Sequence, residues 1–77
     1  MMTILVKGRL NDENIREMDG KLRRIVKGFK EIVSSHASTG VVVEKDVWIV
    51  VEMISKEGWE IESIHDWSRK IANHITF

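Results

Sequence analysis

Apolar residues recur at three- and four-residue spacing over the first half of the chain, and this pattern constrains the fold most. They are Ile15, Met18, Leu22, Ile25, Val26, Phe29 and Val33. That spacing predicts the buried face of an amphipathic helix, for which Asn11 or Asp12 is a suitable N-cap. Gly20 and Gly28 each weaken a helix by about 1 kcal/mol relative to alanine. We therefore expect a kink at Gly20 or a helix end near residues 28–30.

Two β-branched segments follow, separated by two residues. Residues 41–44 and 47–54 are rich in valine and isoleucine, and Lys45 and Asp46 stand between them. β-Branched runs on both sides of a two-residue break predict an antiparallel hairpin. Residues 3–6 are also apolar and β-branched, which predicts a further short strand near the N-terminus.

The last quarter of the chain carries a second helical pattern. From Trp59 onward, residues repeat at spacings of three and four: Ile61, Ile64, Ser68, Ile71 and Ile75. Alternation fails at Glu62 and Ser63, so the spacing predicts a second helix over residues 59–75 rather than a third hairpin strand. The resulting order, (β)-α-β-β-α, predicts an α+β fold, an open-faced sandwich with two helices packed on one face of a small antiparallel sheet.

The length of the chain sets its domain organisation. We expect a single domain over residues 1–77, in which residues 10–77 form the sandwich and residues 1–9 add a strand or a linker. A chain of this size buries only about 60% of its unfolded surface. It has no cysteine for disulfides or thiolate metal sites. Oligomerisation or metal binding through histidine and carboxylates remains as an aid to stability, and we expect a homodimer.

The charges of the chain balance. There are 12 lysines and arginines and 12 aspartates and glutamates, whereas a dedicated nucleic-acid binder usually carries a basic excess. We therefore expect no nucleic-acid partner. The longest unbroken apolar run, residues 47–51, is too short to span a membrane, and no signal-peptide pattern is visible. We expect a soluble cytoplasmic domain without direct membrane insertion.

No short motif assigns a reaction to the chain. Glycine-rich, P-loop and zinc-protease motifs are absent from the sequence, and no serine near His36 is marked as a nucleophile, so we expect no enzyme. The spacing between His36, Glu52 and His65 matches no short metal motif, and a packed histidine or a solvent-facing carboxylate is the commoner role at such positions. Trp48 and Trp67 suit either the core or a dimer surface.

The order and spacing of these segments resemble a known family over residues 10–75. The stretch begins with Leu-Asn-Asp at residues 10–12 and continues through an amphipathic helix to a histidine-bearing strand at residues 32–36. After the hairpin, residues 59–71 match the second helix of the family pattern, which carries a histidine near its start, here His65. This segment gives the strongest part of the resemblance. This pattern resembles the cytoplasmic C-terminal domain of the cation diffusion facilitator, or cation efflux, metal transporters.

The resemblance implies a ferredoxin-like, metallochaperone-like domain that forms a homodimer, binds a divalent metal and regulates the transmembrane part of a metal transporter. It implies three metal ligands: His36 on a strand, Glu52 on the second hairpin strand and His65 on the second helix. Such a set suits zinc, manganese, iron, cobalt or nickel, with water or a partner residue completing the site. Binding would weaken below about pH 6.5, because imidazole must be neutral to bind metal.

A second interpretation stays open. The element order is also similar to that of non-metal α+β homodimeric interaction modules, such as ribosome-hibernation and alkaline-shock domains. Thermal stabilisation by metal would favour the first interpretation, whereas salt-sensitive binding to RNA would favour the second.

Overall fold

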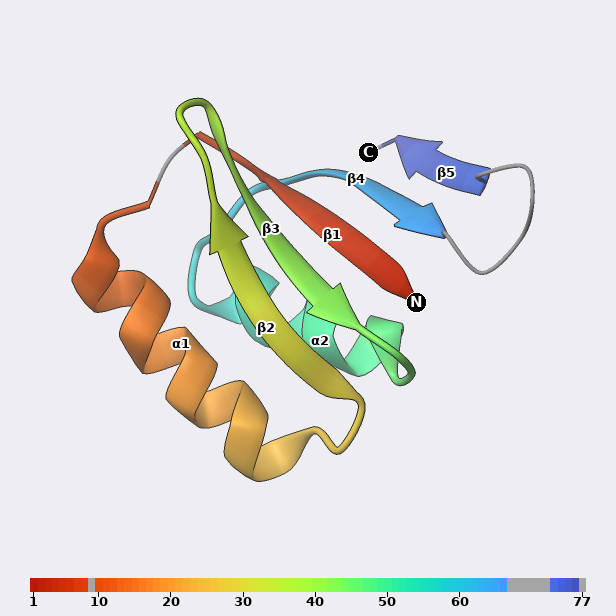
Figure 1. Cartoon of the computed structure of the whole chain (residues 1–77), viewed down its shortest axis with the longest axis horizontal. Helices are drawn as coiled ribbons and strands as arrows, with labels where there is room; N and C mark the ends of the chain where they lie inside the picture. The colour runs from red at the N-terminus through yellow and green to blue at the C-terminus, as the bar shows by residue number, and fades with distance from the viewer. Residues whose placement is uncertain (9, 67–72, 77) are drawn as a thin grey trace.

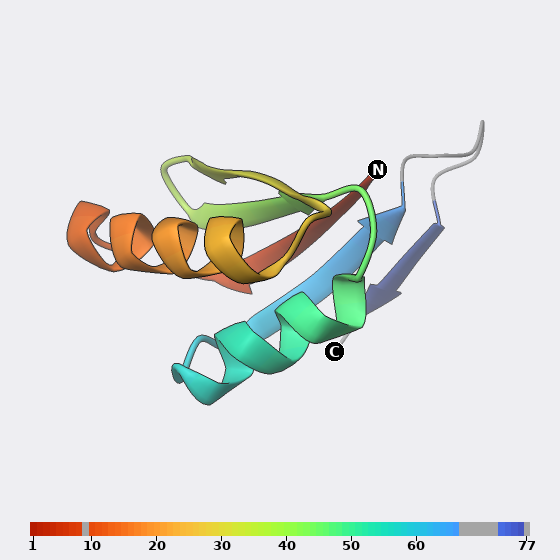
Figure 2. The same cartoon turned by 90° about the horizontal axis from the view of Figure 1, so that it is seen from below.

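The computed structural model describes residues 1–8, 10–66 and 73–76. Within them the elements are β1 (Met2–Lys7), α1 (Asp12–Ile25), β2 (Phe29–Ser34), β3 (Ser38–Val43), α2 (Val47–Lys56), β4 (Ile61–Asp66) and β5 (Asn73–Thr76). The strands form one antiparallel sheet in the order β2-β3-β1-β4-β5 (Figure 1). Both helices lie on the same side of this sheet (Figure 2). The β-α-β-β-α-β order of the first six elements is that of ferredoxin-like folds, so the predicted fold class is confirmed.

The core lies between the sheet and the two helices. Ile4 on β1 is opposite Val41 on β3 and Ile64 on β4, so a row of buried side chains crosses three strands. Met18 and Leu22 from α1, and Val47, Val50 and Ile54 from α2, pack against the same cluster. Neither helix in the described ranges is long and apolar enough to cross a membrane.

Helix α1 begins as predicted and ends earlier than predicted. The Asn11 side chain accepts a hydrogen bond from the backbone N–H of Asn14 at 2.8 Å, which makes Asn11 the N-cap. The helix ends at Ile25, and the residues from Phe29 to Val33 belong to strand β2 instead. Val26 is already extended, with φ −112° and ψ 110°, and Gly28 lies so close to the next segment that an added Cβ would approach the backbone oxygen of Lys45 to 2.5 Å.

Arg23 connects the last turn of α1 to strand β2. Its guanidinium donates hydrogen bonds to both carboxylate oxygens of Asp19, at 3.0 and 3.2 Å, and this bonding raises the pKa of Arg23. The same group donates to the carbonyl oxygen of Lys30 at 3.1 Å and lies 5.0 Å from the ring centre of Phe29. The end of the helix is thus held over the first residues of the strand that follows it.

The predicted second hairpin strand, residues 47–54, is wrong, because this segment forms helix α2. Val47, Val50 and Ile54 are buried at helical spacing, and their burial against the sheet overrides the strand preference of β-branched residues. Asp46 adopts a left-handed conformation with φ 62° at the junction between β3 and α2. The hairpin of the structure is instead β2–β3, joined at residues 35–37.

The predicted second helix, residues 59–75, is also wrong over its described part, which contains strands β4 and β5. Ile61 and Ile64 both lie in the core although they are three residues apart. The register between β1 and β4 shifts at this point, and such a bulge adds one residue to the strand. The bulge therefore gives the strand a three-residue apolar spacing, which is the spacing expected of a helix. Trp67, Ser68 and Ile71 lie outside the described residues.

Two predicted strands are present in the structure. The segment at residues 3–6 lies within β1, which occupies the centre of the sheet between β3 and β4. The valines at residues 41–43 form the second half of β3, although β3 pairs with β1 and β2 and not with residues 47–54.

Candidate functional site

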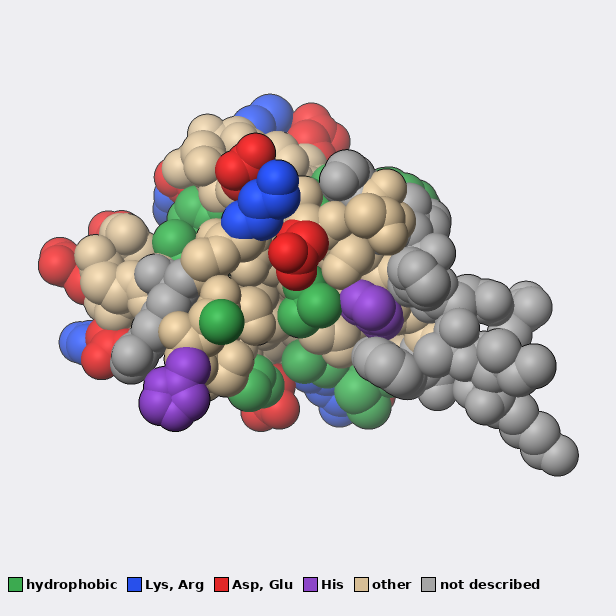
Figure 3. All heavy atoms as spheres, turned by 90° about the horizontal axis from the view of Figure 1, so that it is seen from above, with side chains coloured by type: hydrophobic (Ala, Val, Ile, Leu, Met, Phe, Trp, Pro, Cys, Tyr) green, Lys and Arg blue, Asp and Glu red, His purple; other side chains and the backbone are tan. Residues whose placement is uncertain are grey.

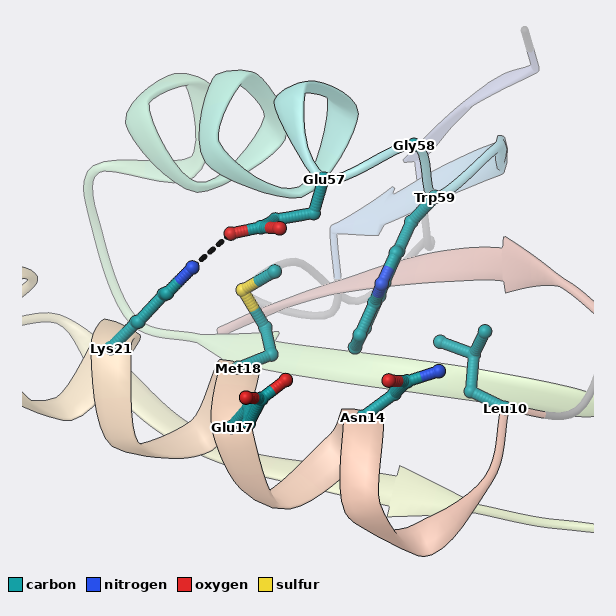
Figure 4. A pocket seen from close by; sticks show the side chains of 8 residues that line it. All are labelled: Leu10, Asn14, Glu17, Met18, Lys21, Glu57, Gly58 and Trp59. Carbon is teal, nitrogen blue, oxygen red and sulfur yellow. Dashed lines mark hydrogen bonds and ion pairs between the residues drawn. The ribbon is translucent and has the colours of Figure 1, made fainter.

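A cleft of about 280 Å³ opens between α1 and the connection from α2 to β4. The residues that line it are Leu10, Asn14, Glu17, Met18, Lys21, Glu57, Gly58 and Trp59 (Figure 4). Pockets for small molecules usually enclose about 300–1,000 Å³. This cleft lies just below the lower end of that range, so only a ligand of about one or two rings would fit in it.

One wall of the cleft is a single face of α1. Asn14, Glu17, Met18 and Lys21 are spaced by three and four residues, so the helix presents all four on one side. Met18 is buried and forms the apolar floor, while the other three side chains are polar and line the rim. Leu10, just before the helix, adds a second apolar group at the far end (Figure 4).

The opposite wall depends on how helix α2 ends. The N–H of Gly58 donates to the carbonyl of Ser55 at 3.0 Å, and the N–H of Trp59 donates to the carbonyl of Ile54 at 3.1 Å. With Gly58 at φ 87°, these two bonds form a Schellman motif, which requires a left-handed residue at its centre. The motif turns the chain so that the indole of Trp59 points toward α1 (Figure 4).

An ion pair closes one end of the cleft. The ammonium of Lys21 on α1 donates to the carboxylate of Glu57, the residue that caps α2 (Figure 4). Both side chains are partly exposed, and pairs of this kind contribute at most about 1 kcal/mol to stability. Glu17 adds a second carboxylate to the rim, so the cleft carries one net negative charge.

The structure places the three predicted metal ligands on different elements. His36 is exposed in the turn between β2 and β3 rather than on a strand. Glu52 is exposed on α2 rather than on a strand, and its carboxylate lies 3.3 Å from the ammonium of Lys56. His65 lies on β4 rather than on a helix, with its Nε2 3.0 Å from the hydroxyl of Ser63.

These three residues are not brought together. His65 faces away from the helices, because its neighbour Ile64 points into the core, whereas Glu52 belongs to a helix on the opposite side. The described histidine side chains are well separated on the surface, with hydrophobic side chains between them (Figure 3). The side chains that the structure describes, which do not include that of His74, form no group of three or more histidines, aspartates or glutamates placed to hold a metal ion. Metal binding through this set stays a prediction.

Comparison with known proteins adds no relative to this picture. No family model matches the chain, and no curated protein or solved structure matches it. The similarity to cation efflux domains therefore depends on the sequence pattern alone, and the function that it implies stays a prediction.

None of the residues that line the cleft is predicted as a binding residue from the sequence pattern. The useful signal was Gly58 followed by Trp59, since a glycine just after a helix and an apolar residue next to it are typical of a Schellman motif. The signal depends on a helix that ends before Gly58, and the prediction of a strand over residues 47–54 excludes such a helix.

Proposed function

We propose that this chain is a small-ligand-binding domain, and that its cleft receives an organic cation with a flat apolar body. The observation that carries the proposal is the cleft itself, in which an indole, a thioether and two carboxylates converge between α1 and the end of α2. Half of the lining residues are polar or charged, and polar groups that converge on a few apolar side chains are a feature of small-molecule sites.

The apolar part of the cleft favours a flat ligand. Trp59 is half-buried and presents its ring toward α1, with Met18 and Leu10 beside it (Figure 4). A planar group can stack on an indole face, and methionine adapts its shape to the ring edge of such a ligand.

The charge of the cleft favours a cation. Lys21 is already paired with Glu57, while Glu17 forms no ion pair with any residue that the structure describes. An amine placed near Glu17 would gain a carboxylate partner, and its charge would also be attracted to the face of Trp59. An anionic ligand would meet two carboxylates at the rim and would be disfavoured.

Three probes with the same ring and different charge test this proposal. Tryptamine, indole and indole-3-acetate are titrated into ¹⁵N-labelled protein, and the indole N–H signal of Trp59 is followed, after assignment with a Trp59→Phe variant. We expect affinity to fall from tryptamine to indole to indole-3-acetate. Equal or tighter binding of indole-3-acetate, or shifts confined to residues outside the cleft, would contradict the proposal.

A matched pair of variants locates the charge effect. Glu17→Gln removes the unpaired carboxylate of the cleft, and we expect it to weaken tryptamine binding by roughly two- to fivefold. Glu31→Gln makes the same change on the exposed strand β2, outside the cleft, and is expected to leave the affinity unchanged. An equal loss in both variants would mean that the overall charge of the protein, and not the cleft, attracts the amine.

A further inference from the structure

Strand β2 forms one edge of the sheet. The strand order β2-β3-β1-β4-β5 leaves β2 paired with β3 on one side and with no strand on the other. Unpaired backbone groups along such an edge are a template for another extended chain, and proteins usually cover or interrupt them. The free edge of β2 is therefore a place where pairing with another strand would begin.

The hydrogen bonds of the β2–β3 hairpin identify the groups that face this edge. The N–H of Ser35 donates to the carbonyl of Ser38 at 2.9 Å, so these two residues form a hydrogen-bonded pair of the ladder. Bonded and non-bonded pairs alternate along an antiparallel ladder, so the N–H and C=O groups of Ile32 and Ser34 point away from β3. Within the part of the chain that the structure describes, no hydrogen bond from outside the sheet reaches these groups.

Arg23 occupies the edge nearer the start of β2. Its guanidinium donates to the carbonyl oxygen of Lys30 at 3.1 Å. Lys30 has no partner residue on β3, because the register shifts between Phe29 and Glu31, and the strand is bulged at this point. Helix α1 runs beside β2 on the side away from β3 (Figure 1), so Arg23 reaches the strand from the side where another strand would lie.

We infer that Arg23 blocks the addition of a further strand to the edge of β2. An added strand would need the Lys30 carbonyl as an acceptor and the space that the guanidinium fills, and the bulge interrupts the regular bonding pattern that it would follow. The rest of the free edge, residues 32–34, is at the short end of the usual range of strand lengths. The contact between α1 and β2 thus keeps the sheet from extending.

Two further contacts hold the guanidinium in this position. Asp19, one turn earlier on α1, accepts hydrogen bonds from Arg23 at 3.0 and 3.2 Å. The ring centre of Phe29, a buried residue, lies 5.0 Å from the guanidinium carbon, which is within the range of a cation–π interaction. The planar fork of arginine can donate to the carboxylate and to the carbonyl at once, whereas lysine lacks this geometry. Arg23 does not line the ligand cleft, so this role is independent of the proposed function.

A matched pair of arginine variants tests the inference. Arg23→Ala and Arg24→Ala each remove one positive charge from the last turn of α1, but Arg24 makes no hydrogen bond or ion pair with any residue in the described ranges. In a solution of this protein alone, another copy supplies the added strand. We expect the weight-average sedimentation coefficient of Arg23→Ala to rise above that of the unchanged chain as the concentration increases, and Arg24→Ala to match the unchanged chain. No rise in Arg23→Ala, or an equal rise in both variants, would overturn the inference.

Amide hydrogen exchange separates strand addition from partial unfolding. If Arg23→Ala associates through β2, the N–H groups of Ile32 and Ser34 should exchange more slowly as its concentration rises, while the amides of β1 keep their protection. Faster exchange throughout β1 and β3 would mean that the association comes from lost stability, and it would overturn the inference.

A proline on the free edge provides a second test. Ser34→Pro removes an N–H that points away from β3, so it breaks no bond of the ladder, and proline is tolerated at such edge positions. Added to Arg23→Ala, it should return the sedimentation coefficient to that of the unchanged chain. Circular dichroism checks that the double variant is folded, and a folded double variant that still associates would overturn the inference.

Discussion

Helices α1 and α2 cover the same face of the sheet, yet their solvent-facing sides differ in kind. Each buries a short apolar stripe against the strands. The solvent side of α1 is charged along its length, with acidic residues in the first turn and basic residues in the last. The first turn of α2 contains no acidic residue and exposes a tryptophan and an isoleucine. A polar outer side is typical of a helix that faces water, whereas exposed large apolar side chains on a helix are a less common feature.

The difference extends to how the helices begin. α1 has a side-chain cap from Asn11 and carboxylates in its first turn, all of which stabilise its free N–H groups. α2 follows a left-handed Asp46 that makes no capping hydrogen bond. The first helix thus carries its own local stabilisation, whereas the second depends mainly on packing. Capping residues can be recognised in a sequence, whereas the tertiary contacts of a helix cannot.

The largest predicted effect concerns the buried residues of the two helices, and it tests whether each helix contributes equally to the free energy of unfolding. Leu22 on α1 and Ile54 on α2 are both 0% exposed. We expect Leu22→Ala and Ile54→Ala each to lower the free energy of unfolding by about 2–5 kcal/mol, through lost burial and the cavity left behind. Urea denaturation followed by circular dichroism measures both. Arg16→Ala and Ser55→Ala, on the exposed sides, should change it by less than about 0.5 kcal/mol.

The next effect concerns the point where the end of α1 meets the start of α2. An alanine Cβ at position 28 would lie 2.5 Å from the carbonyl oxygen of Lys45, so the backbone of one segment must move. We expect Gly28→Ala to destabilise the protein by about 1–3 kcal/mol. Gly20→Ala is the control, because its Cβ would meet only the Arg24 guanidinium, at 3.7 Å. That change should stabilise α1 by about 0.5–1 kcal/mol, and a loss of stability would show that Gly20 is strained.

The same contrast explains what the sequence could predict. The start of α1 was predictable, because Asn11 and the apolar spacing that follows it are local signals. Its end was not, since Val26 turns to an extended conformation and the Gly28 that follows packs against Lys45, seventeen positions further on, which no local signal announces. The fold class was predicted correctly although two of its segments were assigned the wrong structure. Residues 47–54 form a helix and not a strand, and the described part of residues 59–75 forms strands and not a helix, yet the order of elements is still that of a small α+β sandwich.

Helix α2 and strand β4 show two physical reasons for failure. In α2 the β-branched residues favour a strand, and only burial of Val47, Val50 and Ile54 against the sheet decides for a helix. In β4 a bulge opposite β1 sets Ile61 and Ile64 three residues apart on one face, which a pattern search interprets as a helical turn. The cleft was missed for the same reason, because its Trp59 wall is recognisable only once α2 is known to end before it.

The cap of α1 gives a smaller effect. Asn11→Ala removes the side-chain oxygen that accepts a hydrogen bond from the N–H of Asn14. We expect a loss of about 1 kcal/mol in the free energy of unfolding, within the range of about 0.5–2 kcal/mol for such caps. Asn11→Ser, which keeps a capping oxygen, should recover most of the loss. If serine and alanine are equally destabilising, the contribution of Asn11 does not come from capping.

The smallest effect is expected at the start of α2, where no cap exists to be lost. Asp46→Asn keeps a residue that tolerates the left-handed conformation and removes only the negative charge near the helix N-terminus. We expect it to cost about 0.3–1 kcal/mol at low ionic strength, and to cost less as salt is added, because the charge acts through the helix dipole. Thermal unfolding at two salt concentrations measures this. A cost that does not change with salt would mean that Asp46 acts through a hydrogen bond. In that case the two helices would begin more alike than their geometry indicates.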